Sequence, residues 1–414
     1  MNRSLVLFGA FPCFLFAQFA ELATTGDGKQ LYFTSTLKWK GQAPDRAEYR
    51  IYRAIETGDI QLFAERGDLA FKFGGGSSDG ARSPQVSADG ETVALTLQGI
   101  CESTSGCTSN SRWRAEIRGR YASVLGDGAV YLSGNARWAL FVPHGIPGMN
   151  TAPGASPLLI NLETGDRGSV PPLSPFLSRP LASDGSVIVQ ETSVPPGTPA
   201  SAKIALWSAG NVTPINLPDA SSIWGRSDDG ALLVYTEFTS AISRLHLMAR
   251  FLATGKDVEL ASANTPAIPL FMGVSSDGRR VIYRIAGSSP AGPAFIVDTS
   301  TGSASPIPLP SGEFASDGAL SGLGNVAYLV TTTGRIVRYD LTTGALIEAV
   351  PPTPYIRNSY QFSPGSLLRL DGTLPHSQPS LDGAILLNNL PVPILWVNDR
   401  ENRGSNAVAT RQYL

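Results

Sequence analysis

The stretch Ser275-Ser276-Asp277-Gly278-Arg279-Arg280-Val281-Ile282-Tyr283 contains the two signals that decide the fold. It begins with a tight turn, because Asp-Gly pairs supply the positive φ that short hairpin turns require. It ends in an apolar run without alternation, which is typical of a strand covered on both faces. Further on, Phe295-Ile296-Val297-Asp298 and the pair Thr301-Gly302 add another strand and a second turn. The segment therefore predicts a short antiparallel unit of strands and tight turns.

The first turn signal recurs along the chain, each time followed by a short apolar run. We assign six aspartates to these repeat turns: Asp27, Asp89, Asp127, Asp184, Asp229 and Asp277. A seventh copy, Gly322-Leu323-Gly324-Asn325, holds the equivalent place without an aspartate. The spacing from Gly185 to Gly230 is 45 residues, from Gly230 to Gly278 it is 48, and from Gly278 to Gly324 it is 46. The Thr-Gly type of landmark keeps the same period, because Gly165, Gly210 and Gly255 follow one another at intervals of 45.

A repeat of this length, built from strands and turns, is typical of a β-propeller. We therefore predict an all-β protein with a seven-bladed β-propeller over residues 18–350. We interpret the aspartates as turn residues and assign no catalytic role to them. The predicted blades span residues 18–63, 82–124, 128–170, 179–216, 221–262, 269–309 and 318–350.

Composition narrows the function classes. Charged residues make up 16% of the chain and the formal net charge is -2. We therefore do not expect the protein to bind nucleic acid, because neutralising phosphates requires a basic surface. The same balance gives no electrostatic reason to expect binding to acidic lipids.

Residues 1–17 have the pattern of an export signal. Asn2-Arg3 gives a positive start, Leu5–Ala17 is apolar, and Ala17 offers a cleavage site. The run is too short to span a membrane, which takes about 20 apolar residues. A buried N-terminal strand is the alternative interpretation.

Two cysteines remain after such a signal is removed. Cys101 and Cys107 lie in the polar loop Cys-Glu-Ser-Thr-Ser-Gly-Cys, and an even pair fits an oxidising compartment. We predict a disulfide between them, with free thiols as the alternative.

The repeat resembles a known family. The pattern Ser-x-Asp-Gly, an apolar strand ending in Tyr or Thr, and a turn of the type Asp-x-x-Thr-Gly is similar to the WD-like repeats of TolB-type bacterial propellers. The resemblance covers residues 18–350, although the proline usual between Ser and Asp in that family is absent. It implies a propeller that interacts with another protein of the cell envelope.

The pattern changes after the prolines at 351–354, and we predict a linker over residues 351–362. Residues 363–398 resemble the start of an Ig-like IPT/TIG-type module found in secreted proteins of acidobacteria. That module would be partial, because a complete sandwich of this kind needs about 100 residues. Residues 399–414 are polar and unpatterned, which predicts an unstructured tail.

The sequence contains little that indicates catalysis. The three histidines, His144, His246 and His376, are far apart and lack a neighbouring nucleophile or further metal ligands. No Gly-x-Ser-x-Gly elbow is present, and Gly74-Gly75-Gly76 lacks the lysine of a phosphate loop. We therefore predict no catalytic residues, no metal and no cofactor.

The functional prediction is an exported, non-enzymatic, monomeric scaffold in the periplasm or outside the cell, whose partner is an envelope or extracellular protein. It is not expected to be integral to a membrane. The alternative is a propeller-fold enzyme of the glycosidase, lyase or lactonase type, with its site in the central channel. Acidic or histidine side chains that converge on that channel would favour the alternative.

Overall fold

The computed structural model describes residues 19–25, 30–35, 50–55, 60–64, 80–100, 111–143, 156–171, 181–190, 204–218, 221–287, 292–333, 335–350, 377–379, 385–388, 394–398 and 409–413. These residues form strands and turns, with one single-turn 3-10 helix, η2 (Ser240–Ile242), and no α-helix among them. The predicted all-β class is confirmed. Within the same residues, no helix is long and apolar enough to cross a membrane.

The strands follow one another as antiparallel neighbours, in units numbered here along the chain. Units 1 to 4 contain β1 (Phe19–Thr24), β2 (Gln30–Ser35), β3 (Arg50–Ile55), β4 (Ile60–Ala64), β5 (Gly80–Val86), β6 (Thr92–Ile100), β7 (Ser111–Gly119), β8 (Ser123–Leu132), β9 (Trp138–Pro143), β10 (Leu158–Asn161), β11 (Arg167–Ser169), β12 (Val187–Gln190), β13 (Ile204–Ser208) and β14 (Asn211–Ile215). Units 5 to 8 contain β15 (Ser222–Arg226), β16 (Leu232–Thr239), β17 (Arg244–Phe251), β18 (Lys256–Asn264), β19 (Ile268–Val274), β20 (Arg280–Ala286), β21 (Ala294–Asp298), β22 (Ala304–Pro306), β23 (Ala315–Leu320), β24 (Val326–Thr331), β25 (Ile336–Asp340), β26 (Leu346–Val350), β27 (Ser377–Pro379), β28 (Ile385–Asn388), β29 (Ile394–Asn398) and β30 (Ala409–Tyr413).

Five of the units are separate four-stranded sheets, with strand orders β1-β2-β3-β4, β15-β16-β17-β18, β19-β20-β21-β22, β23-β24-β25-β26 and β27-β28-β29-β30. Units 2 and 3 share the long strand β8, whose first half pairs with β7 and whose second half pairs with β9. In unit 4 the strands β12, β13 and β14 form a sheet, and Leu181 adds a single bridge to Val187.

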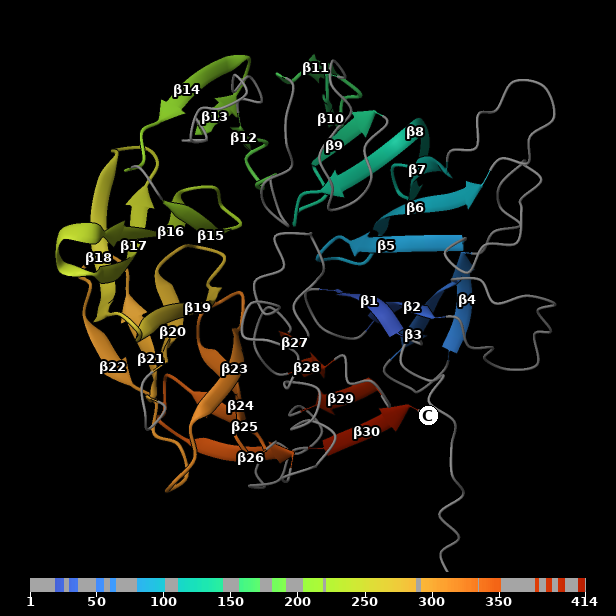
Figure 1. Ribbon diagram of the computed structural model, residues 1–414. Coiled ribbons are helices and arrows are strands. Elements are labelled where there is room, and N and C mark those ends of the chain that lie inside the picture. Colours follow the sequence, from blue (N-terminus) through green and yellow to red (C-terminus); the bar gives the residue numbers. More distant parts are fainter. Residues whose placement is uncertain are drawn as a thin grey trace, which may run out of the picture.

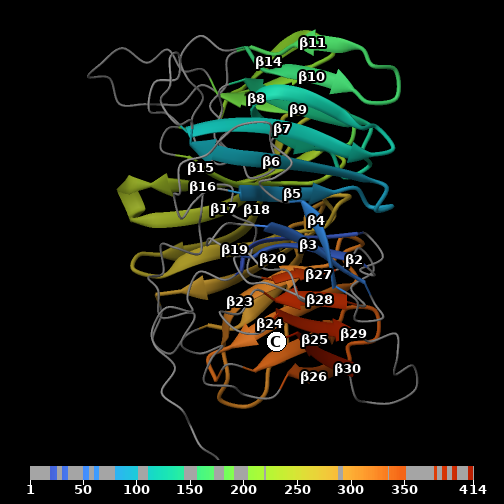
Figure 2. The same cartoon turned by 90° about the vertical axis from the view of Figure 1, so that its right-hand side faces the viewer.

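The sheets stand around a common centre, to which each unit presents its first strand (Figure 1). Strands β1, β5, β15, β19, β23 and β27 lie on this inner side. Seen from the side, the sheets are stacked against one another with their strands running across the ring (Figure 2). The fifth unit fits the predicted pattern, because Leu245–Phe251 lies in strand β17.

The C-terminal region differs from the prediction. The described strands of residues 377–413 form the four-stranded sheet β27–β30, in the same strand order as the other units, and no Ig-like module is supported. This sheet contacts β23 and β26 on one side and β1 on the other, so it occupies a place in the ring. The described strands therefore make eight units, and the predicted count of seven is not confirmed. Strand β30 also lies inside the predicted unstructured tail.

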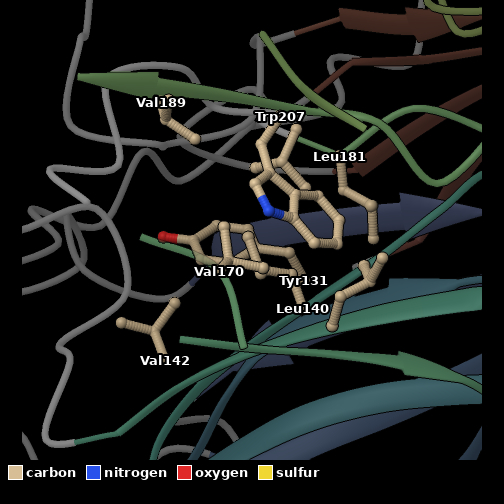
Figure 3. Packing of buried hydrophobic residues seen from close by; sticks show 9 residues of the cluster. Tyr131, Leu140, Val142, Val170, Leu181, Val189 and Trp207 are labelled. Atoms are coloured by element: carbon tan, nitrogen blue, oxygen red, sulfur yellow. The ribbon is translucent and has the colours of Figure 1, made fainter. Parts of the chain in front are cut away.

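The core consists of apolar clusters, each between two neighbouring units. One cluster joins units 3 and 4, where Trp207 is 5% exposed and packs among Tyr131, Leu140 and Val189 (Figure 3). Trp207 is therefore a core residue. A second cluster of the same kind joins β16 and β17 to β20 and β21. Since each middle strand is covered on both faces, Val281 and Ile282 are both fully buried.

Gly210 and Gly185 distinguish two reasons for which a turn requires glycine, the left-handed backbone and the lack of space for a side chain. Gly210 has φ of +86° and a Cβ added there would meet nothing within 4 Å, whereas at Gly185, with φ of +82°, it would lie 2.6 Å from Trp138. We expect Gly210→Ala to lower the free energy of unfolding by about 1 kcal/mol, the cost of a left-handed non-glycine residue. Gly185→Ala adds a collision and should cost roughly 2–4 kcal/mol. Urea titration of both variants checks this, and equal losses would contradict it.

Candidate binding surfaces

The inner turns join the first strand of each unit to the second, and unit 6 shows how their residues act. The Ser275 Oγ donates to the Asp277 Oδ1 at 2.7 Å and accepts from the Arg280 backbone N–H at 3.0 Å. The same carboxylate oxygen accepts from the Arg279 N–H at 3.1 Å. The Gly278 N–H donates to the Ser275 carbonyl at 3.0 Å, and its φ is +67°. Serine, aspartate and glycine together satisfy the polar groups of the turn.

The other described inner turns share two features with that of unit 6, the hydrogen bond from the fourth N–H to the first carbonyl and the positive φ of the fourth residue. They comprise Ser87–Gly90, Ser133–Ala136, Ala182–Gly185, Ser227–Gly230 and Ser321–Gly324. Asp89, Asp184 and Asp229 each accept a hydrogen bond from the backbone N–H two residues on. Asp27 lies outside the described residues.

The assignment of Asp127 to an inner turn is wrong. Asp127 lies inside β8, opposite Arg114 of β7, where the chain runs from unit 2 into unit 3 without a turn. The inner turn of unit 3 is Ser133–Ala136, in which Asn135 replaces the aspartate and Ala136 takes the left-handed position with φ of +55°. The spacing could have found it, because Ala136 lies 46 residues after Gly90 and 49 before Gly185.

Inner turns of neighbouring units are joined by direct hydrogen bonds, for which the second or third turn residue supplies a donor. The backbone bonds run from Ala88 N to Gly134 O at 3.0 Å, Ser183 N to Asp228 O at 2.8 Å, Asp229 N to Ser276 O at 3.0 Å and Ser276 N to Gly322 O at 2.7 Å. Between units 3 and 4 the Asn135 side-chain amide donates to the Ser183 carbonyl at 2.8 Å. A belt of hydrogen bonds therefore runs through the inner turns of units 2 to 7.

Arg226 reinforces this belt between units 4 and 5. Its guanidinium is buried and donates to the Ser186 carbonyl at 3.0 Å, to the Ser186 Oγ at 2.5 Å and to the Gly230 carbonyl at 3.1 Å. Burial lowers the pKa of Arg226 to about 10, against the opposing effect of Asp184, Asp229 and Asp228. Across the same junction, the Ser183 Oγ donates to the Asp228 carboxylate at 2.7 Å.

The outer turns, between the third and fourth strands, are built on one acceptor. In unit 6 the Asp298 Oδ1 accepts from the Ser300 Oγ at 2.5 Å and from the N–H groups of Ser300 and Thr301 at 2.9 and 3.3 Å. The hydrogen bond from the Ser300 side chain, aided by the two backbone donors, holds the pKa of Asp298 below its ordinary value. Asn161 fills the same place in unit 3 and accepts from the Glu163 and Thr164 N–H groups.

The hairpin of β16 and β17 offers a surface of another kind. We call its turn, Phe238–Ser243, the apolar tip, because Phe238 is 41% and Ile242 57% exposed and all six residues are uncharged. The tip lies at the end of β16 that is remote from the inner turn, where the β16–β17 hairpin protrudes from one side of the stacked sheets in Figure 2. Its backbone is fixed, since the Ser243 N–H donates to the Ser240 carbonyl at 3.2 Å and the Thr265 N–H donates to the Ser243 carbonyl at 2.9 Å.

His246 lies beside this tip, on strand β17. Its Nδ1 is 2.9 Å from the Glu259 Oε2. Burial raises the pKa of Glu259, but hydrogen bonds from Ser262 and His246 outweigh it and leave that pKa below the ordinary value. His144, His376, Cys101 and Cys107 lie outside the described residues. Among the residues that are described, no group of three or more His, Cys, Asp or Glu side chains is placed to hold a metal ion.

Comparisons place this architecture among known folds. No protein-family model and no curated protein sequence matches the chain. A solved chain from a study of two prolyl endopeptidases aligns over 96% of this chain and 50% of its own length, with 12% identity and a TM-score of 0.52. The β-propeller domain of the trilobed protease from Pyrococcus furiosus aligns over 82% of this chain and 99% of its own, with 11% identity and a TM-score of 0.49. TolB from Acinetobacter baumannii aligns over 69% of this chain and 62% of its own, with 16% identity and a TM-score of 0.34.

The chain is a β-propeller. At these identities the likeness shows the fold alone, and the chain spans half the length of the prolyl endopeptidases that it matches. Propeller neighbours include enzymes as well as TolB, so they do not decide between catalysis and binding.

Removing one inner-turn serine tests the turn chemistry. In Ser227→Ala the Asp229 carboxylate loses a donor, and the buried N–H of Leu232 loses an acceptor that lies at 2.9 Å. We expect the free energy of unfolding to fall by about 1–3 kcal/mol. Denaturant titration measures it, and the exposed Ser222→Ala in the same unit is the control, expected within about 0.5 kcal/mol of the parent. A loss no larger than the control's would contradict the assigned role.

The outer turns predict a specific acid sensitivity. Because the folded-state pKa of Asp298 is depressed, its ionised form stabilises the fold above the unfolded pKa, and this contribution disappears as the pH falls through the folded value. We expect Asp298→Asn to reduce the slope of stability against pH below about pH 4. Stability near pH 7 should change little, since Asn161 already fills this position in unit 3. Denaturant titrations between pH 2 and 7 measure both effects, and an unchanged acid slope would contradict the prediction.

Proposed function

We propose that this β-propeller is an exported, non-enzymatic scaffold and that a partner protein docks on the apolar tip, Phe238–Ser243. The partner is an envelope or extracellular protein, in keeping with the TolB-type repeat and the signal-like residues 1–17. The chain itself acts as a monomer in the periplasm or outside the cell. The predicted disulfide between Cys101 and Cys107 belongs to the same proposal.

The observation that carries the proposal is the exposure of two large apolar side chains on a fixed turn. Covering the exposed parts of Phe238 and Ile242 gives about 1 kcal/mol each from the hydrophobic effect. Because the tip is already held by hydrogen bonds from Ser243 and Thr265, little conformational entropy is lost on docking. Exposed apolar side chains on a rigid support are the typical centre of a protein interface.

The aspartates of the inner turns give a second reason to expect a binding role. Asp89, Asp184, Asp229 and Asp277 use carboxylate oxygens within their own turns, where they act as hydrogen-bond acceptors for the chain. We assign these aspartates to shaping the ring and place the docking site elsewhere, at the remote end of the β16–β17 hairpin. The tip of unit 5 carries two of the exposed large apolar side chains among the described residues, Phe238 and Ile242.

Affinity capture tests this function. The mature chain is immobilised, incubated with an envelope extract of its own cells, and its retained proteins are identified by mass spectrometry. We expect one partner to be recovered reproducibly, and the double variant Phe238→Ser/Ile242→Ser to retain it about ten-fold less well. The matched control is Val124→Ser/Val212→Ser, which removes two exposed valines from other units.

Circular dichroism and urea titration verify that both variants fold. Equal loss of the partner in the tip variant and the valine control would overturn the docking site. Failure to recover any partner, together with turnover of a glycan or lactone substrate by the purified chain, would overturn the scaffold function.

A further inference from the structure

Four of the described inner turns place an aspartate directly before a glycine, at Asp89-Gly90, Asp184-Gly185, Asp229-Gly230 and Asp277-Gly278. Glycine has no Cβ, so its backbone nitrogen can approach the preceding side chain with little hindrance. In a free peptide that nitrogen can bond to the Cγ of the protonated aspartate side chain, while the amide proton and the carboxyl hydroxyl group leave together as water, and a five-membered succinimide results. Water then reopens the ring. Opening at the backbone carbonyl produces isoaspartate, in which the chain runs through the side chain.

The closed turn holds both reacting groups. In all four turns the glycine N–H donates at 3.0 Å to the carbonyl of the first turn residue, so the attacking nitrogen is fixed in the turn. The aspartate Oδ1 is fixed as well, because it accepts the N–H two residues on, at 2.8 to 3.1 Å. The two groups cannot rotate toward each other unless the turn opens.

Unit 4 differs in what holds the aspartate. Units 2, 5 and 6 begin the turn with a serine whose Oγ donates to the aspartate, but unit 4 has Ala182 at that position. Asp184 instead accepts from the N–H and the Oγ of Ser186, at 2.8 and 2.5 Å. The Ser186 Oγ is in turn held by the guanidinium of Arg226, which belongs to unit 5. The hold on Asp184 therefore depends on the contact between two units.

We propose that the four Asp-Gly inner turns are sites of isoaspartate formation that the closed ring suppresses, and that Asp184 reacts first when units 4 and 5 separate. The modification needs no enzyme, and water is its only co-reactant. It converts a transient opening of the ring into a lasting covalent mark. The inference is independent of the proposed scaffold function.

The test compares the intact full chain with its Arg226→Met variant during long incubation at neutral pH, below the unfolding temperature. Peptide mapping by mass spectrometry then counts isoaspartate at each site. In the parent, all four sites should react far more slowly than in the same chain unfolded in urea. In Arg226→Met, we expect isoaspartate at Asp184 to increase about five-fold relative to Asp277, which serves as the control within the same molecule.

Ser186→Ala carries the same expectation by a smaller change, and it decides the matter if Arg226→Met does not fold. Ser87→Ala is the reciprocal control, because it should favour reaction at Asp89 and leave Asp184 unchanged. Native sites that react as fast as the unfolded chain would overturn the proposal. Equal increases at Asp184 and Asp277 in Arg226→Met, or in Ser186→Ala, would overturn the assigned role of the junction.

Discussion

The left-handed residue at the fourth position of the described inner turns is the constraint on which the ring depends. Gly90, Gly185, Gly230, Gly278 and Gly324 fill it with positive φ, and Ala136 does so in unit 3. This conformation turns the chain back tightly enough for the fourth N–H to reach the first carbonyl. The second and third residues then face the next unit, and one of them donates a hydrogen bond to a carbonyl of the neighbouring inner turn. One local backbone choice thereby fixes both the hairpin inside a unit and the junction between units.

Much of the fold could be predicted because the residues that mark the repeat are required by the geometry of turns and buried strands. Asp-Gly and Thr-Gly turns, together with apolar runs covered on both faces, located most of the strands of units 4 to 7. Unit 3 was misread because Asn135 and Ala136 satisfy the same turn without the Asp-Gly pair. The preceding strand β8 contains Gly126-Asp127-Gly128, which resembles the turn signal. These residues lie inside a strand that two units share, and they form no inner turn.

The eighth unit was missed for a related reason. Between β27 and β28 the sequence reads Ser380-Leu381-Asp382-Gly383, which is the repeat signal itself, followed by the apolar run at 384–387. The signal lies 59 residues after Gly324 and not near 46, and proline-rich sequence precedes it. The break in spacing therefore concealed the sequence signal of the last unit. The apolar tip could not be predicted either, because only packing decides that Phe238 is exposed while Val234, on the same strand, is fully buried.

The first and the last sheet of the described ring each consist of consecutive strands. The sheet β1–β4 and the sheet β27–β30 are each built in strand order, and no strand of one is inserted into the other. The two sheets lie side by side, with contacts between β1 and β27. The position of the termini is then incidental to the architecture. A circular permutant, with the old ends joined and new ones opened between two other units, would keep every sheet unchanged.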